Sequence, residues 1–312
     1  MERLLYNSAT ERRATMELRV LRYFLAVARE ENITAAAETL HVTQPTLSKQ
    51  LMDLEAELGK NLLIRGNRKI KLTEDGMFLR KRAQEIIELA DKTEASFKSE
   101  DEFISGEVYI GGGETDAFRY IAKTLLRMRE NHPQIHFHIY SGNGEDVTER
   151  LDKGLIDFGL FVGSTELKKY DFLTLPASDT WGLLMRRDNP LAKRSSISPQ
   201  DLLNIPLLCS RQSLLQNELA GWLGYTPEKL QIIGTYNPIY NASIIVEEGI
   251  CSAITIDGLI NTDESCLCFR PFKPGMSAPL SIAWKKYQVF SKAAGTFLET
   301  LQQELRRQSH ET

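Results

Sequence analysis

Cysteine is scarce in this chain of 312 residues, and long apolar runs are missing. The four cysteines, Cys209, Cys251, Cys266 and Cys268, lie in apolar surroundings, which favours reduced intracellular (cytoplasmic) thiols over a disulfide framework. No apolar run reaches the roughly 18 residues that a membrane span needs, so we expect no membrane partner. Residues 1–15 are polar and lack the apolar segment of a secretory signal, and we interpret them as a disordered extension.

Catalytic motifs are missing as well. The chain has neither a GxSxG element, which would supply an acyl-transfer nucleophile, nor a P-loop. Asp116 stands where a dinucleotide-binding loop beginning at Gly111 would have its third glycine. His136 and His138 share one face of a predicted strand, but no carboxylate or cysteine lies at a ligand spacing from them. We therefore expect no enzymatic activity, no cofactor and no metal site.

Charged residues are divided unevenly along the chain. The formal net charge is −4, which by itself argues weakly against a nucleic-acid partner. Residues 16–98 hold 14 basic and 13 acidic residues, whereas residues 99–312 hold 21 and 27. Residues 60–71 contain five basic side chains and no acidic one. Such a local basic patch is typical of a surface that contacts phosphates.

Three helices are predicted near the N-terminus. Apolar residues at helical spacing predict the first over residues 18–30, and Thr34 is a natural N-cap for a short second helix that ends at residue 40. A third helix is predicted over residues 44–58, because Pro45 is tolerated in a first turn and leucines then recur every three or four residues. Helix, short turn and helix in this order indicate a helix-turn-helix.

The third predicted helix has an apolar face and a polar face. The polar residues suit a major groove: Gln44, Thr46, Ser48 and Lys49. For this helix alone, an ordinary solvated face is the simpler interpretation. Residues 62–73 favour the DNA-binding interpretation. They are predicted to form two short strands around Gly66-Asn67, which together make a wing. Arg65 and Arg68 of this wing can reach phosphates or the minor groove. Residues 16–73 are thus predicted to form a winged helix-turn-helix DNA-binding domain.

A long helix is predicted over residues 74–98. Its small and apolar residues follow a 4-3-4-3-4 repeat: Leu79, Ala83, Ile86, Ala90, Thr93 and Phe97. This repeat is typical of a dimerisation seam, and a homodimer would hold two recognition helices at the separation of about 34 Å that one side of a duplex requires. Packing of the helix on its own domain is the alternative.

These N-terminal segments resemble one family. The resemblance is carried by Phe24-Leu25-Ala26-Val27-Ala28 and by residues 34–40 (TAAAETL), 43–51 (TQPTLSKQL) and 72–76 (LTEDG). With the spacing intact over about sixty residues, this pattern is similar to that of the LysR-type transcriptional regulators. The resemblance implies a sequence-specific promoter-binding protein that forms a homodimer through the 74–98 helix and assembles further into a homotetramer.

The resemblance also implies which side chains contact double-stranded DNA. They are Thr34, Thr43, Gln44, Thr46, Ser48, Lys49, Arg65 and Arg68. Thr34 would meet a phosphate at a helix N-terminus. Lys49 stands where the family usually has arginine, and a lysine lacks the bidentate fork, so a phosphate contact is expected in place of a guanine contact.

Strand–helix alternation from residue 106 onward predicts an α/β domain with a parallel sheet. The resemblance implies a two-lobed effector-binding domain like a periplasmic binding protein, with lobe one at residues 106–163 and 269–305 and lobe two at residues 164–268. Ligands bind beyond the carboxyl ends of parallel strands. That rule selects these effector-binding candidates: Gly113, Glu114, Thr115, Asn143, Phe161, Ser210, Arg211 and Tyr236.

Two acidic residues in the first of these loops bear on the effector. Many relatives present Ser or Thr to a carboxylate ligand, as Thr115 could, but Glu114 and Asp116 would repel an anion unless Arg211 or a proton compensates. A small effector that is zwitterionic, cationic or neutral is one interpretation. The other is that the two carboxylates only cap the following helix and favour its dipole.

Two other functions fit the same scaffold less well. A thiol-based redox sensor is the first, but Cys266 and Cys268 alternate on a predicted strand and so point to opposite faces. Buried, inert thiols are the simpler interpretation. A stand-alone solute-binding protein is the second, and the DNA-binding half argues against it.

Overall fold

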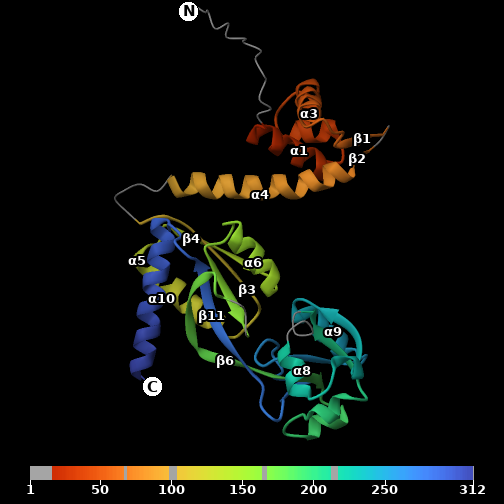
Figure 1. Cartoon of the computed structure of the whole chain (residues 1–312), viewed down its shortest axis with the longest axis vertical. Coiled ribbons are helices and arrows are strands. Elements are labelled where there is room, and N and C mark those ends of the chain that lie inside the picture. The colour runs from red at the N-terminus through yellow and green to blue at the C-terminus, as the bar shows by residue number, and fades with distance from the viewer. Residues whose placement is uncertain (1–15, 67–68, 98–103, 164–166, 212–216, 312) are drawn as a thin grey trace, which may run out of the picture. The chain divides into compact units, whose positions relative to one another are not determined.

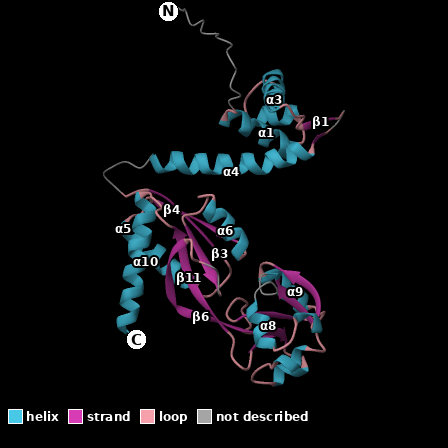
Figure 2. Ribbon diagram, in the orientation of Figure 1, coloured by secondary structure: helices cyan, strands magenta, loops and turns pink. Residues whose placement is uncertain are grey.

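The computed structural model describes residues 16–66, 69–97, 104–163, 167–211 and 217–311 (Figure 1). The chain divides into two compact units, with the boundary after Glu94. The first unit is helical with one small sheet, and the second mixes helices with a large sheet (Figure 2). Within the described ranges, no helix is both long and apolar enough to cross a membrane.

The first unit is a winged helix-turn-helix followed by a long helix. Its elements are α1 (Leu18–Glu30), α2 (Ile33–Thr39), α3 (Gln44–Leu58), β1 (Leu63–Arg65), β2 (Ile70–Leu72) and α4 (Glu74–Phe97). Leu47, Leu51 and Leu54 of α3 are at most 2% exposed and share one core with Leu21 and Phe24 of α1. Burying each such side chain stabilises the unit by about 1.5–3 kcal/mol, so the leucine stripe fixes which face of α3 turns outward.

Asn32, and not Thr34 as expected, is the N-cap of α2. The Asn32 side chain accepts hydrogen bonds from the backbone amides of Thr34 at 2.8 Å and Ala35 at 3.1 Å. Asparagine caps a helix at least as well as threonine, and the extended backbone of Asn32 places it just before the first turn. Thr34 therefore lies inside the helix with an exposed side chain.

Thr73 joins the wing to α4. Its hydroxyl donates to the carbonyl of Asn61 at 2.7 Å and accepts from the amide of Gly76 at 2.9 Å. A Cβ atom on Gly76 would lie 2.1 Å from the carbonyl oxygen of Leu62, so this close approach requires glycine.

The first half of α4 packs on its own unit. Leu79, Ala83 and Ile87 are at most 9% exposed and belong to the same core as α1 and α3. Leu79 and Ala83, two residues of the predicted dimerisation seam, thus follow the alternative interpretation, because this core covers their face of the helix. Other apolar side chains of α4 remain exposed, including Ile86 and Phe97 of the predicted seam: Met77, Phe78, Ile86, Leu89 and Phe97.

Lobe one of the second unit is built around a mostly parallel sheet. Its elements are β3 (Gly106–Gly112), α5 (Phe118–Asn131), β4 (Ile135–Ser141), α6 (Gly144–Asp152), β5 (Phe158–Val162), β11 (Ser277–Lys285) and α10 (Lys292–Glu311). Strand β3 pairs in parallel with β4 and β5, and β11 pairs antiparallel with β5. Phe158 and Phe297, both fully buried, tie the sheet to α10.

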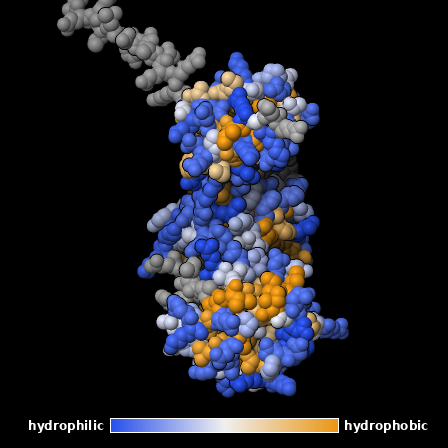
Figure 3. Space-filling view, turned by 90° about the vertical axis from the view of Figure 1, so that its right-hand side faces the viewer, coloured by the Kyte–Doolittle hydropathy of each residue, from blue (hydrophilic) through white to orange (hydrophobic). Residues whose placement is uncertain are grey.

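Lobe two has a smaller sheet of the same kind. It contains β7 (Pro206–Ser210), α8 (Asn217–Leu223), β8 (Gln231–Tyr236), α9 (Ile239–Glu247), β9 (Ser252–Ile256) and β10 (Leu267–Pro271), with short 3-10 helices at residues 190–193, 199–202 and 227–229. Strand β7 pairs in parallel with β8 and β9. Exposed apolar side chains occur at Ile244 and Ile245 of α9 and at Ile250, and hydrophobic residues gather on the lower part of the face drawn in Figure 3.

One 17-residue strand, β6 (Tyr170–Arg186), runs through both lobes. Residues 170–174 and 178–180 pair with β11, and residues 181–186 pair with β9 and β10. The crossing between lobes thus falls inside β6, and not after residue 163 as expected. Similarly, residues 269–271 pair within lobe two, so the return crossing follows β10.

Candidate nucleic-acid interface and ligand cleft

The N-terminal end of α3 presents a group of polar side chains. Thr43 caps the helix: its Oγ1 accepts from the amide of Thr46 at 3.4 Å and lies 2.8 Å from the Thr46 hydroxyl. Thr43, Gln44, Thr46 and Lys49 are exposed, and Ser48 is half-buried. These five predicted contacts share the first turns of one helix whose opposite face is anchored by leucines. The arrangement supplies donors and acceptors of the kind that read a major groove.

Glu55 organises the start of the wing, a role that the sequence reading missed. Its Oε1 accepts from the amides of Leu62 at 2.8 Å and Leu63 at 3.0 Å, and its Oε2 pairs with Arg65 at 3.2 Å. The carboxylate therefore joins α3 to β1 and restricts the position of the Arg65 guanidinium. A charge-assisted bond to backbone amides is among the stronger hydrogen bonds in proteins.

The other side of the wing is fastened to α1. The backbone carbonyl of Glu31 accepts from the amide of Ile70 at 2.8 Å, and its side chain pairs with Lys69 at 2.7 Å. The hydrogen bond between the two side chains lowers the pKa of Glu31 and raises the pKa of Lys69. Arg68, the second predicted wing contact, lies outside the described residues.

Thr34 has only its side chain to offer a phosphate. Its backbone amide already bonds to Asn32, while its side chain is exposed in the first turn of α2. The predicted phosphate contact is therefore reduced to one hydroxyl.

A cavity of about 340 Å³ opens between the lobes of the second unit. Five of the eight predicted effector residues line it: Gly113, Glu114, Asn143, Ser210 and Tyr236. The sequence reading missed other lining residues as candidates: Tyr140, Ser141, Gly142, Asp146, Val162, Trp181, Asn237, Pro238, Ile239, Thr255, Ile256 and Leu259. Ser141, Gly142, Val162 and Asn237 lie within two residues of a predicted one. Trp181 and Thr255 come from β6 and β9, which meet only in the folded sheet.

Three predicted residues are not among the described residues that line the cavity. Thr115 is buried and engaged with its own protein, because its hydroxyl donates to Asp179 at 2.9 Å and accepts from the amide of Ala117 at 3.0 Å. Phe161 is 2% exposed and packs in the core beside α6. Side chains alternate along a strand, so its neighbour Val162 faces the cavity. Arg211 is exposed.

The cavity wall carries acidic groups. Glu114 Oε2 accepts from the amide of Ile239 at 2.9 Å, at the first residue of α9. Asp146 and Asn143 form a reciprocal capping box at the start of α6. No Lys, Arg or His occurs among the described residues that line the cavity. Glu114 does not cap the helix that follows it, as one interpretation expected, because its carboxylate caps a helix of the other lobe.

Two buried polar groups sit beside this wall. Asp179 is 6% exposed, and its Oδ2 has no hydrogen-bond partner among the described residues. Burial raises the pKa of Asp179 to about 6. The Nε1 of Trp181, a lining residue that is 7% exposed, is likewise unpaired within the described part of the chain. Tyr236 is different: its hydroxyl donates to the carbonyl of Ile254 at 2.6 Å, and burial raises its pKa.

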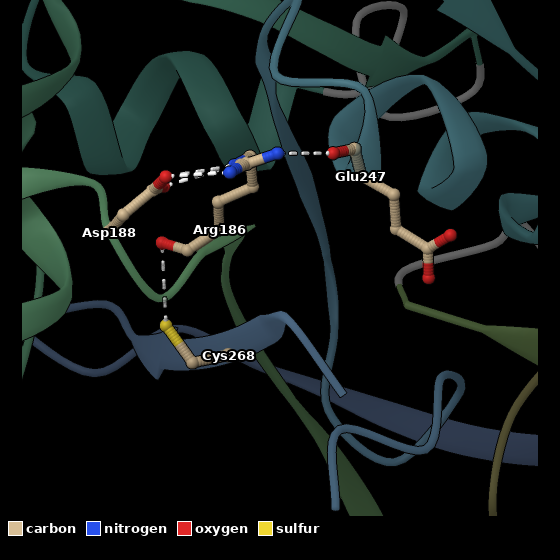
Figure 4. Close-up of polar contacts among 4 residues, drawn as sticks. All are labelled: Arg186, Asp188, Glu247 and Cys268. Carbon is tan, nitrogen blue, oxygen red and sulfur yellow. Dashed lines mark hydrogen bonds and ion pairs between the residues drawn. The ribbon is translucent and has the colours of Figure 1, made fainter. Parts of the chain in front are cut away.

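Three of the four cysteines are buried. Burial raises the pKa of Cys209 to about 12 and also raises the pKa of Cys251, which disfavours the reactive thiolates. Cys268 is buried, with its sulfur 4.0 Å from the carbonyl oxygen of Arg186 (Figure 4). Cys266 is exposed. In the described part of the chain, no three side chains are grouped as metal ligands.

Each of the two units matches a known protein family. Residues 18–77 match the family described as bacterial regulatory helix-turn-helix protein, lysR family. Residues 102–306 match the family described as LysR substrate binding domain. Together the two matches cover most of the chain.

Individual proteins similar to this chain are also transcriptional regulators. The Hca operon transcriptional activator HcaR of Escherichia coli (strain K12) is 28% identical over 298 residues, covering 93% of this chain and 98% of HcaR. The HTH-type transcriptional regulator CysL of Bacillus subtilis (strain 168) is 31% identical over 188 residues, 59% of this chain and 62% of CysL. The similarity to CysL thus spans less than two thirds of that relative.

Solved structures share the fold. Full-length CbnR complexed with its target DNA gives a TM-score of 0.72 at 22% identity, covering 93% of this chain and all of CbnR. Full-length BenM gives a TM-score of 0.53 at 24% identity, covering 94% of this chain and 98% of BenM.

Proposed function

Because the chain belongs to the LysR family of bacterial regulatory helix-turn-helix proteins, we propose that it binds promoter DNA and that a small polar effector controls this binding. The observation that carries the DNA half is the α3 surface. Thr43, Gln44, Thr46 and Lys49 are exposed at one end of a helix whose leucines are buried. A helix anchored in this way can enter a major groove without disturbing its own core.

Each DNA contact has a distinct role in this proposal. Gln44 and Thr46 meet base edges, because amide and hydroxyl groups can pair with them, whereas Lys49 meets a phosphate. The wing arginines, Arg65 and Arg68, hold the backbone or the minor groove. Thr34 and Ser48 add hydroxyl contacts beside them. Phosphate contacts supply affinity and base contacts supply sequence preference.

Homodimerisation through the helix at residues 74–98 completes the DNA half. The exposed Phe78, Leu89 and Phe97 of α4 offer the apolar surface for a second copy. A dimer is needed because one recognition helix reads only a half-site. We propose that two dimers join as a tetramer, as the family resemblance implies.

The effector half of the proposal rests on the cavity between the lobes. Five residues predicted for this site line it, three from lobe one and two from lobe two. An effector that binds one lobe separation better than another shifts the population toward that form. Carried through the dimer, this shift would change the spacing of the DNA-binding heads, so the footprint changes even where the affinity does not.

Selection of duplexes from a random pool with the purified full chain tests this proposal. We expect enrichment of related half-sites whose centres lie about 10 base pairs or a multiple apart. A pool that shows no enrichment over its starting composition, with a monomeric protein, would contradict it.

A further inference from the structure

Helix α9 begins without a cap from its own segment. Its N-cap residue is Pro238, and no side chain of that residue bonds to the helix. The cap comes from the other lobe instead, where Glu114 Oε2 accepts from the amide of Ile239 at 2.9 Å. The first amides of a helix lack partners within it and carry a partial positive charge, so they favour an anion. Glu114 thus occupies the anion position of α9.

Helix α9 is firmly part of lobe two. Ile239, Ala242 and Val246 are buried in the core of that lobe. At the other end of the helix, Arg186 donates to the carbonyl of Glu247 at 2.8 Å while Asp188 pairs with the same guanidinium (Figure 4). The bond from Glu114 to Ile239 is therefore a direct link between the lobes at the wall of the cavity.

The remaining wall favours a positively charged ligand over a negative one. Asp146 is a second acid there, and no basic side chain is found among the lining residues that the structure describes. Tyr140, Trp181 and Tyr236 also line the space, and the guanidinium of Arg150, which is not a lining residue, lies 4.1 Å from the centre of the Tyr140 ring. Aromatic side chains and carboxylates together attract organic cations, whereas an anion placed beside Glu114 and Asp146 would meet like charge.

We infer that Glu114 is a built-in anion that selects the effector class: the cleft takes an organic cation, such as a primary amine on an apolar body, and rejects simple carboxylates. This inference rests on the proposed function, since it takes the cleft to be the effector site. Glu114 is exposed, so its carboxylate is accessible to a ligand entering the cleft. A carboxylate ligand would have to displace Glu114 from α9.

Two variants of the full chain separate the negative charge of Glu114 from its role as hydrogen-bond acceptor for Ile239. Glu114→Ala empties the anion position, whereas Glu114→Gln keeps an acceptor for Ile239 without the charge. Asp116→Ala is the matched control, because Asp116 is the neighbouring acid but pairs with Arg119 at 2.8 Å and is absent from the lining. The probes are acetate, phenylacetate and phenethylamine. Binding of each probe is measured by thermal unfolding and by calorimetry at pH 7.5 and constant ionic strength.

We expect acetate and phenylacetate to stabilise Glu114→Ala saturably and to leave the wild type, Glu114→Gln and Asp116→Ala unchanged. Phenethylamine should bind the wild type and Asp116→Ala about tenfold more tightly than either Glu114 variant, the ratio that loss of one charge-assisted contact gives. Saturable carboxylate binding by the wild type, failure of carboxylates to bind Glu114→Ala, or the absence of any preference for phenethylamine would overturn the inference.

The two proposals can fail separately. Binding of the probes is measured without DNA. The finding that Glu114→Ala binds carboxylates would therefore stand even if no small molecule altered promoter binding. Conversely, if a carboxylate altered DNA binding by the wild type, the inference about Glu114 would be overturned and the proposed function as a regulator would stand.

Discussion

The hydroxyl of Thr115 donates a 2.9 Å hydrogen bond to Oδ1 of Asp179, and this pair connects the loop after β3 to the strand that runs through both lobes. Both residues are buried, at 7% and 6% exposure. The second carboxyl oxygen of Asp179 lacks a partner in the described residues, and burial raises the pKa to about 6. A charge at the crossing between lobes is therefore disfavoured, and Asp179 keeps its proton to a higher pH than an ordinary aspartic acid.

The Asp179 carboxyl should make stability depend on pH. Its ordinary pKa is 3.8 and its folded pKa is about 6, so its favourable contribution is full below 3.8 and is lost as the pH rises through about 6. We expect Asp179→Asn, which keeps the acceptor for Thr115, to be more stable than the wild type at pH 8 by about 1–2 kcal/mol. Urea unfolding at pH 5 and pH 8 measures this; a variant that is less stable at pH 8 would contradict it.

The core face of α3 should matter far more than its outer face for stability. Leu51 is 1% exposed, so Leu51→Ala should lower the free energy of unfolding by about 2–5 kcal/mol. Met52, the next residue, is 53% exposed, and Met52→Ala should change it by less than about 0.5 kcal/mol. Urea denaturation of both variants provides the comparison, and equal losses would mean that α3 is oriented differently.

The polar face should divide into base and phosphate contacts. Gln44→Ala should reduce the preference for the specific duplex over a competitor duplex, measured as the difference between the two binding free energies, by about 1–3 kcal/mol. Arg65→Ala should weaken binding to every duplex and lower the salt dependence by about one counterion. Gel-shift titrations at several salt concentrations distinguish these outcomes. Lys193→Ala, an exposed change in the other unit, is the control and should have no effect.

The exposed side of α4 should control dimerisation. Leu89 is 42% exposed, and Leu89→Glu would place a charge in the proposed interface between copies. Sedimentation analysis should show a shift toward monomer at micromolar concentration. Met52→Glu, an equivalent change on α3, should keep the oligomer, and dissociation of both variants would mean that the effect is not local to α4.

Much of the fold was predictable because periodicity reports local structure. The three helices near the N-terminus, the hairpin and the strand–helix alternation all follow from residue spacing. The cap of α2 was assigned to the wrong residue, since Asn32 and Thr34 are both good caps and only the backbone decides between them. The lobe boundaries were also misplaced, because a long strand that pairs in both lobes has no mark in the sequence at its crossing.

The cleft was predictable only in part. Residues after parallel strands, such as Gly113, Asn143 and Ser210, were found because strand ends meet at one edge. Phe161 was wrong by one position, because a strand turns alternate side chains to opposite faces. The bond of Glu114 to Ile239 joins residues far apart in the chain, and local sequence carries no signal for such a pair.

The most direct measurement of the central claim is a hydroxyl-radical footprint of the purified chain on its selected duplex. The α3 surface predicts protection of two half-sites on one side of the duplex, about 10 base pairs or a multiple apart, and predicts that Gln44→Ala weakens this protection on the selected sequence alone. Protection that is uniform along the duplex, or unchanged by Gln44→Ala, would contradict reading of base edges by α3.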